Sequence, residues 1–202
     1  MIGILGGSFD PIHYGHLRTA LDVQQALDLD EIRLIPLRDP PHRGALDADP
    51  ETRLAMVRAA VADEPCLRAD DRELKRSGKS YTLDTLLSLR TETGAQPLCL
   101  LMGTDAFRGF PSWYRPEEIL QQAHLVVMHR PGETPPEIFT KHRADSQEAL
   151  TSDPAGRILF LPVTQLDISA TRIRSMLRAG LSPRYLLPEG VLSIIRQQGL
   201  YR

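Results

Sequence analysis

The segment 6–16, Gly-Gly-Ser-Phe-Asp-Pro-Ile-His-Tyr-Gly-His, constrains the fold of this chain more than any other stretch. It follows the short apolar run 2–5 and precedes a helix-like pattern, so the chain begins as a strand, a glycine turn and a helix start. A helix N-terminus presents unpaired N–H groups and a partial positive charge, and glycine lets the backbone approach a phosphate closely. His13 and His16 add side-chain donors at the same turn. The segment therefore predicts an anion site at the carboxyl end of the first strand.

The glycines and histidines of this segment fit neither of the two commonest phosphate-binding motifs. No Gly-Lys-Ser/Thr follows, which excludes a P-loop, and the dinucleotide pattern G-x-G-x-x-G is absent. A pair of histidines that only satisfies local hydrogen bonds at a helix start is the competing interpretation. The position of the pair, after a strand and two adjacent glycines, favours a third kind of phosphate site with His-x-Gly-His as its signature.

The composition is that of an ordinary globular protein. Of 202 residues, 42% are hydrophobic and 25% are charged, and 24 Lys and Arg against 26 Asp and Glu give a net charge of −2. We therefore expect a single domain over residues 1–202, with no bulk binding to nucleic acid or to a membrane surface. No apolar run approaches about 18 residues, which predicts no transmembrane helix, and the N-terminal residues lack the features of a signal peptide. Cys66 and Cys99 have no metal-ligand spacing, so we expect buried thiols in a reducing, cytoplasmic environment.

Short apolar runs alternate with helix-like patterns along the chain. The expected strands are 2–6, 31–36, 65–69, 97–102, 123–128 and 157–162. The expected helices are 16–27, one from Pro50 with Asp49 as its N-cap, one capped by Ser80 or Thr82, 116–120, 168–179 and 188–198, with a weak helical piece within 137–150. This alternation predicts an α/β fold, a Rossmann-like, doubly wound, mostly parallel sheet with helices on both faces and a C-terminal helical segment over about 168–202. Ligands of such a sheet bind beyond the carboxyl ends of the strands.

A second segment, Ile-Ser-Ala-Thr-Arg-Ile-Arg at 168–174, also has the chemistry of an anion site. Ser169 and Thr171 can cap a helix, which by itself would explain both hydroxyls. Arg174 follows one turn later, and its planar guanidinium pairs well with phosphate oxygens. Such a segment alone is weak evidence. Paired with a distant His-x-Gly-His, it predicts that hydroxyls, free N–H groups and a guanidinium converge on one anion.

The two motifs together resemble the nucleotidyltransferase branch of the HIGH superfamily, in which G-x-F-D-P-x-H-x-G-H and I-S-x-T-x-x-R segments bind the triphosphate of ATP. Within that branch the chain is similar to the bacterial nicotinate-nucleotide adenylyltransferases over almost its whole length. The similarity includes Pro-Pro-His-Arg at 40–43, Ser-Tyr-Thr-Leu-Asp-Thr-Leu at 80–86, Leu-Met-Gly-Thr-Asp at 101–105, Trp113 and Gly-Leu-Tyr at 199–201. Ala170 and Arg43 differ from the serine and lysine common in that family, and neither difference removes a group that the chemistry needs.

The resemblance implies an enzyme of NAD biosynthesis that transfers the adenylyl group of ATP to nicotinate mononucleotide, giving nicotinate adenine dinucleotide and pyrophosphate, with Mg²⁺ on the ATP phosphates. His13, His16 and Arg174 are then the catalytic residues, with His16 at the α-phosphate and His13 at the neighbouring phosphates. The implied ATP-binding residues are Gly7, Ser8, Phe9, His13, His16, Gly103, Asp105, Ile168, Ser169, Thr171 and Arg174. Gly103 and Asp105 would hold the ribose, and a turn with a capping aspartate is the competing interpretation.

Adenylyl transfer of this kind requires little proton transfer by the protein. The 5′-phosphate that attacks the α-phosphorus is already ionised at neutral pH, so no general base is needed. The protein has to align the two phosphates and stabilise the charge on the departing pyrophosphate. A protonated histidine would do this best, and a nearby triphosphate could keep an imidazole charged because its usual pKa is about 6.5.

The implied acceptor site combines one helix start with three loop segments. Its expected residues are His42, Arg43, Tyr81, Thr82, Trp113 and Arg130. The ring of Trp113 can stack on a pyridine. The helix start at Thr82 can bind the nicotinate carboxylate through backbone N–H groups, which favours the acid over the amide. For His42 and Arg43, which belong to the long loop 37–50, a solvated loop is the competing interpretation.

Other functions fit part of the sequence. The same core could adenylylate nicotinamide mononucleotide or phosphopantetheine, although Trp113 favours a pyridine ring. A nucleotide-sensing module would keep the triphosphate site without transfer, and the intact His13, His16 and Arg174 argue against it. An RNA-charging ligase shares His-x-Gly-His but needs a Lys-Met-Ser-Lys-Ser-like loop and an RNA-binding appendage, and the sequence has neither. Small-molecule substrates are therefore the expected partners, with the protein as a monomer or a homodimer.

Overall fold

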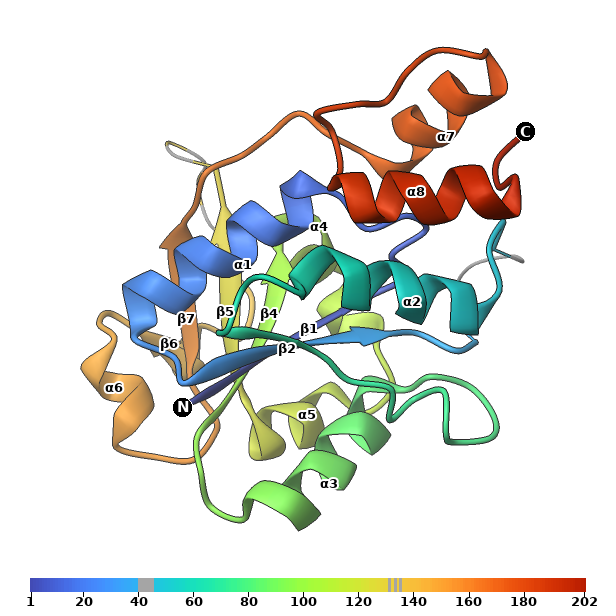
Figure 1. The fold of residues 1–202 in the computed structure, drawn as a ribbon. Helices are drawn as coiled ribbons and strands as arrows, with labels where there is room; N and C mark the ends of the chain where they lie inside the picture. The colour runs from blue at the N-terminus through green and yellow to red at the C-terminus, as the bar shows by residue number, and fades with distance from the viewer. Residues whose placement is uncertain (40–45, 131, 133, 135) are drawn as a thin grey trace.

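The computed structural model describes residues 1–39, 46–130, 132, 134 and 136–202, and it shows a seven-stranded sheet (Figure 1). The strands are β1 (Ile2–Gly7), β2 (Glu31–Pro36), β3 (Leu67–Ala69), β4 (Leu98–Gly103), β5 (His124–His129), β6 (Arg143–Ala144) and β7 (Ile158–Pro162). They pair in the order β3-β2-β1-β4-β5-β7-β6, and every pairing in the described residues is parallel. The expected doubly wound α/β fold is confirmed.

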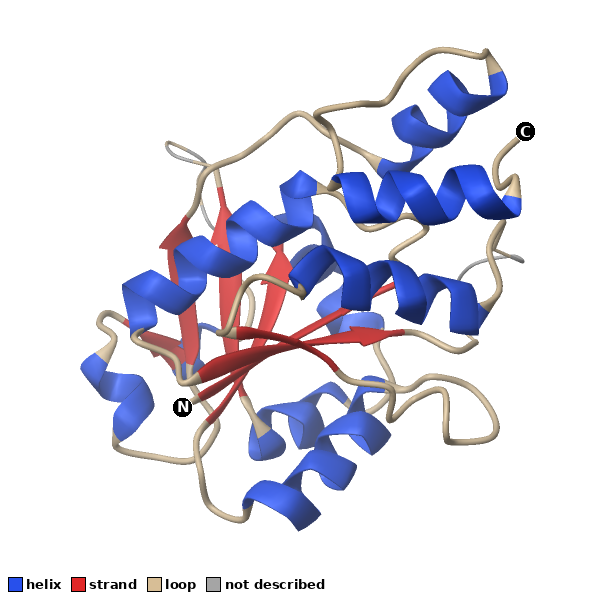
Figure 2. Cartoon of the chain, in the orientation of Figure 1, coloured by secondary structure: helices blue, strands red, loops and turns tan. Residues whose placement is uncertain are grey.

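Helices cover both faces of the sheet, as Figure 2 shows. One face carries α1 (Tyr14–Leu27), α2 (Pro50–Val61), α7 (Ala170–Arg178) and α8 (Glu189–Gln198), and the other carries α3 (Thr82–Thr93), α4 (Thr104–Gly109) and α5 (Pro116–Gln122). The central strand β1 is apolar on both sides, because Leu5 packs into the first core while Ile2 and Ile4 pack into the second. Within the described residues, no helix combines the length and the apolar character that a membrane span needs.

The strand order reverses at β1, which has β2 on one side and β4 on the other. The units β1–α1–β2 and β2–α2–β3 extend the sheet in one direction, and the strands from β4 onward extend it in the other. Gly7 ends β1 and Gly103 ends β4, so the two following turns leave the sheet at the same edge. This is the switch point at which a doubly wound sheet binds its ligands.

Three local expectations need correction. The segment 137–150 is not a helix, because it contains the 3₁₀ turn Thr140–His142, the two-residue β6 and only the beginning of α6 (Glu148–Thr151). The N-cap of α3 is Tyr81, since the hydroxyl of Ser80 instead accepts the backbone N–H groups of Arg38 and Asp39. Cys66 is only half-buried in a turn before β3, whereas Cys99 is buried in β4 as expected. By contrast, Asp49 caps α2 as expected, accepting from the backbone N–H of Thr52 at 2.9 Å.

Gly3→Ala tests how tightly β1 packs against the face that carries α1. A β-carbon on Gly3 would lie 2.7 Å from Cγ1 of Ile32 and 2.9 Å from Cδ1 of Leu29, and both side chains are buried. Overpacking a core costs about 1–3 kcal/mol, so we expect Gly3→Ala to lower the free energy of unfolding in urea by that amount. Gly6→Ala, in the same strand, is the matched control because nothing lies within 4 Å of a β-carbon there. Equal effects of the two substitutions would contradict the packing argument.

Candidate active site

A cavity of about 590 Å³ opens at the carboxyl ends of β1 and β4, at the switch point of the sheet. Its wall combines the glycine turn after β1, the start of α3, the turn after β4 and the segment that follows the 3₁₀ turn Phe110–Ser112. The sequence-predicted residues in this wall are Gly7, Ser8, His16, Tyr81, Thr82, Gly103, Asp105 and Trp113. Residues predicted for ATP and residues predicted for the acceptor therefore face one space.

Phe9 shapes the turn between β1 and α1. It adopts a left-handed conformation with φ of 47°, and the residue is buried and does not line the cavity, so its role is to shape the turn. Its ring packs edge-on against the imidazole of His16, with the centroids 5.2 Å apart. A β-carbon on Gly7 would lie 3.0 Å from the ring of Phe9, which explains why the turn needs glycine at this position.

His13 and His16 stack on each other at the start of α1, with their ring centroids 3.8 Å apart. His13 is the N-cap of the helix, and its backbone N–H donates to Nδ1 of His16 at 3.3 Å. Because Nδ1 of His16 accepts, the neutral imidazole carries its proton on Nε2. A β-carbon on Gly15 would lie 2.9 Å from Nδ1 of His13, so the glycine of His-x-Gly-His makes room for the first imidazole.

Both imidazoles are neutral in the ligand-free protein at neutral pH. Burial lowers the pKa of His13 to about 4, and burial, helped by the neighbouring His13, lowers the pKa of His16 to about 3. Protonation of His16 at Nδ1 would also break its hydrogen bond from the backbone of His13. In the free protein burial thus outweighs the ordinary basicity of the ring, and the expectation that a bound triphosphate keeps an imidazole charged stays a prediction.

The second motif lies directly beside the first. Ser169 caps α7, and its hydroxyl accepts from the backbone N–H of Arg172 at 3.2 Å. Nη1 of Arg174 donates to the backbone carbonyl of Asp10 at 2.8 Å, although 164 residues separate the two in the sequence. The carbonyl oxygen of Ile168 lies 3.5 Å from the position of a β-carbon on Gly15. Ile168 and Arg174 thus adjoin the histidine turn, and neither they nor Ser169 and Thr171 line the cavity.

The start of α3 forms the opposite wall. Tyr81 is its N-cap, and no side chain among the described residues caps it, so the first N–H groups of the helix are left to the cavity. Trp113 is half-buried with its ring centroid 5.6 Å from that of Phe110. Tyr114 was not predicted from the sequence, and its ring lies over that of Tyr81 with the centroids 4.6 Å apart. Aromatic rings and helix N–H groups therefore share one side of the cavity.

Glu73 is a cavity residue that the sequence did not reveal. It is only 4% exposed, its Oε1 accepts from the hydroxyl of Thr85 at 2.6 Å, and its Oε2 has no hydrogen-bond partner among the described residues. Burial raises the pKa of Glu73, and hydrogen bonds from Ser80 and Thr85 oppose that rise. In the sequence Glu73 belongs to a charged stretch that looks like solvated surface, so no local signal marks it.

The remaining predicted residues that the structure describes are either exposed at the cavity or lie away from its wall. Asp105 lines the cavity, but its exposed carboxylate pairs with Arg108 at 2.7 Å. Arg130 is exposed after β5 and is not part of the wall. His42 and Arg43 lie outside the described residues. The cavity wall therefore contains part of the predicted ATP side and part of the predicted acceptor side.

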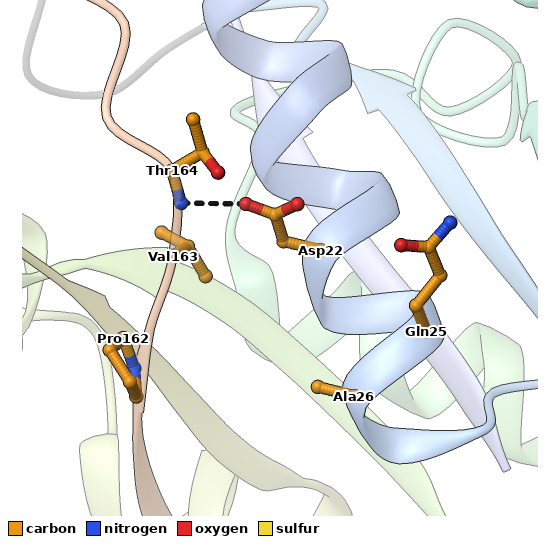
Figure 3. A pocket seen from close by; sticks show the side chains of 6 residues that line it. All are labelled: Asp22, Gln25, Ala26, Pro162, Val163 and Thr164. Atoms are coloured by element: carbon orange, nitrogen blue, oxygen red, sulfur yellow. Dashed lines mark hydrogen bonds between the residues drawn. The ribbon is translucent and has the colours of Figure 1, made fainter.

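A second hollow lies between α1 and the segment after β7, and Figure 3 shows the six side chains that line it. The carboxylate of Asp22 is already engaged there, because it accepts from the backbone N–H of Thr164 at 2.6 Å and from Nε of Arg18 at 2.8 Å. None of the sequence-predicted site residues that the structure describes lines this hollow. The candidate active site is therefore the cavity beyond β1 and β4.

Comparisons with known proteins agree with the fold and the motifs. Residues 4–176 match a family model described as Cytidylyltransferase-like. A "Probable nicotinate-nucleotide adenylyltransferase" of Methylococcus capsulatus is 48% identical over 100% of this chain and 99% of its own length. A protein of Halorhodospira halophila with the same description is 50% identical over 99% of this chain and 94% of its own length.

A solved structure shares the fold at much lower identity. It is the Plasmodium falciparum nicotinic acid mononucleotide adenylyltransferase complexed with NaAD. It is 18% identical to this chain, with a TM-score of 0.77 over 99% of this chain and 96% of that chain. This likeness shows that the architecture, from β1 to α8, is one that known proteins adopt.

The lowered pKa values of the two histidines predict a loss of stability in mild acid. The unfolded chain takes up protons near the ordinary imidazole pKa of about 6.5, while the folded state stays neutral down to about 4, so stability falls as the pH falls through this window. Between about pH 7 and pH 5 we expect the free energy of unfolding in urea to drop by about 2 kcal/mol or more. The double variant His13→Asn/His16→Asn should lose less over the same interval. An equal loss would assign the pH dependence to other groups.

Proposed function

The chain belongs to the cytidylyltransferase-like family and, within it, to the nicotinate-nucleotide adenylyltransferases of NAD biosynthesis, and we propose that the cavity beyond β1 and β4 is where its two nucleotides react. The proposed substrates are ATP and nicotinate mononucleotide, and the products are nicotinate adenine dinucleotide and pyrophosphate. One observation carries this proposal. The cavity is lined by His16 at the start of α1, by the uncapped start of α3 and by Trp113.

The reaction needs alignment and charge stabilisation more than proton transfer. An oxygen of the 5′-phosphate of the acceptor attacks the α-phosphorus of ATP, the bond from that phosphorus to the bridging oxygen breaks, and pyrophosphate leaves with its electron pair. In this proposal His13, His16 and the backbone of Gly7 and Ser8 contact the phosphates from the β1 side. Arg174 and the N-terminus of α7 contact the departing pyrophosphate.

His16 acts in this proposal as a neutral hydrogen-bond donor. Its Nδ1 is occupied by the backbone N–H of His13, so the proton of the neutral ring is on Nε2 and is available to an oxygen of the α-phosphate. The stacking against His13 and the edge of Phe9 holds the ring in place before substrate arrives. A pre-oriented donor of this kind stabilises the charge that develops in the transition state without a change of protonation.

The acceptor is proposed to lie against α3. The unpaired N–H groups after Tyr81 and Thr82 favour the nicotinate carboxylate over a carboxamide, because a full negative charge gains more from a helix N-terminus. Trp113 supplies a flat ring on which the pyridine can stack.

Mg²⁺ is proposed to arrive on the phosphates of ATP. The described residues contain no group of three or more His, Cys, Asp or Glu that could hold a metal ion. The carboxylate nearest the histidine turn, that of Asp10, already accepts from the hydroxyl of Tyr201 and the backbone N–H groups of Asp47 and Ala48. The phosphate oxygens of ATP are therefore better placed than the protein to supply the ligands of Mg²⁺.

A panel of acceptors tests the proposed substrate. Pyrophosphate release from ATP should be at least about fivefold faster, as kcat/KM, with nicotinate mononucleotide than with nicotinamide mononucleotide or phosphopantetheine, since a carboxylate at the start of α3 is worth about 1 kcal/mol or more. Comparable rates with all three acceptors would contradict the assignment of the acid. Binding of ATP without any pyrophosphate release would instead support a nucleotide-sensing module.

Removal of the imidazole of His16 tests its role as a donor. We expect His16→Ala to lower kcat by about 100-fold or more, as the loss of one transition-state donor does elsewhere. His142→Ala is the matched control, because His142 lies in the turn before β6 and not in the cavity wall. A neutral donor further predicts that wild-type kcat does not decline between about pH 6.5 and 8.5.

Two results would remove His16 from this role. Near-normal turnover of His16→Ala would exclude it from the transition state. A tenfold loss of wild-type kcat for each unit of rising pH, abolished by His16→Ala, would show instead that the imidazole has to be protonated.

A further inference from the structure

Asp10 is a buried carboxylate inside the turn that carries the histidines. It is only 2% exposed, and its Oδ1 accepts from the hydroxyl of Tyr201 at 2.6 Å and from the backbone N–H of Ala48 at 3.2 Å. Its Oδ2 accepts from the backbone N–H of Asp47 at 2.9 Å. These donors come from the segment before α2 and from the segment after α8, so Asp10 joins three parts of the chain.

A buried arginine accompanies this carboxylate. Arg53 of α2 is 1% exposed, and it donates to the backbone carbonyls of Ser8 at 2.8 Å and Ala48 at 3.1 Å. Burial lowers the pKa of Arg53, and the negative charge of Asp10 opposes that fall. The negative charge of Asp10 and the positive charge of Arg53 therefore stabilise each other. Both side chains also form hydrogen bonds to the backbone of residues in or near the glycine turn.

Arg174 closes a ring of contacts with Asp10 and Asp47. Its Nη1 donates to the backbone carbonyl of Asp10 at 2.8 Å, and its Nε lies 2.9 Å from Oδ2 of Asp47. The backbone N–H of Asp47 returns to the side chain of Asp10. The orientation of the guanidinium thus depends on where Asp10 is held.

Tyr201 supplies the side-chain hydroxyl in this arrangement. It is 6% exposed, and 191 residues separate it from Asp10. Its φ of 61° lies in the left-handed region, which costs a residue with a large side chain free energy and persists where the surroundings fix the backbone. Burial and the carboxylate of Asp10 raise the pKa of Tyr201, so the hydroxyl remains a donor throughout the working pH range.

We propose that Tyr201 is a positioning residue for the ATP half of the reaction: its hydroxyl fixes Asp10, and Asp10 fixes both Arg174 and the turn that carries His13 and His16. This inference rests on the proposed function. Among the described residues, the wall of the cavity that holds Tyr81 and Trp113 includes neither Tyr201 nor Asp10, so we expect the influence of Tyr201 to fall on the ATP side.

Tyr201→Phe removes only the hydroxyl and keeps the ring in the core. For this variant we expect the Kd of the α,β-methylene analogue of ATP with Mg²⁺ to rise about three- to tenfold in calorimetry, as the loss of one buried hydrogen bond allows. The Kd of nicotinate mononucleotide should stay within about twofold, because its proposed site is on the other wall. Tyr185→Phe is the matched control, since Tyr185 is 87% exposed.

The binding measurement separates this inference from the proposed function. If the wild-type protein releases no pyrophosphate with any acceptor, the proposed function fails, while the effect of Tyr201→Phe on the ATP analogue still decides the positioning role. Unchanged affinity for the analogue, or an equal loss for both nucleotides, overturns that role.

Asp47→Asn provides a second variant that leaves the core intact. It keeps the backbone N–H that reaches Asp10 but removes the charge beside Arg174, and the side chain of Asp47 is 36% exposed. If Tyr201, Asp10 and Asp47 act on Arg174 as a unit, the factor by which the double variant Tyr201→Phe/Asp47→Asn loses affinity for the ATP analogue is smaller than the product of the two single factors. Losses that multiply show two independent contributions and overturn the coupling through Asp10.

Discussion

Parallel pairing of β1 with β2 on one side and β4 on the other is the constraint on which the whole site depends. Because the strands run in one direction, the turns after Gly7 and Gly103 leave the sheet at the same edge, and both helices that follow begin there. The start of α3 reaches the same cavity from the second face of the sheet. Helix N-termini from both faces of the sheet therefore lie at this edge, and under the proposed function their backbone dipoles reduce the need for full charges in the cavity wall.

The positive charges next to the histidine turn lie outside that wall, and each is close to a carboxylate. Arg174 lies between the carboxylate of Asp47 and the carbonyl of Asp10, and Arg53 accompanies the buried charge of Asp10. Buried charges are tolerated when each has a partner and further hydrogen bonds, and here every partner belongs to a segment next to the histidine turn. The desolvated charges of Asp10 and Arg53 thereby also fix the backbone next to the histidine turn, while burial keeps the imidazoles of His13 and His16 neutral in the free protein.

Much of the fold can be predicted from local sequence patterns. The features that cannot be predicted depend on contacts between residues that are distant in the sequence. Alternating apolar runs and helical patterns predict the fold class and every strand except the two-residue β6, and the two motifs predict that Arg174 and the histidine turn meet. The neutral state of His16 was not predicted, because burial is a property of the assembled core. Glu73 and Tyr201 were not predicted as site residues either, because their roles depend on Thr85 across a turn and on Asp10 across 191 residues.

Trp113 gives the protein an optical property that follows from its place in the cavity wall. It is the single tryptophan of the chain, and it is half-buried beside Phe110 at the side where the rings of Tyr81 and Tyr114 lie. Emission from an indole responds to the polarity and the stacking partners around it. The tryptophan fluorescence of this protein therefore comes from one wall of the cavity alone. It reports whether that wall is exposed to water, shielded from water or covered by another ring.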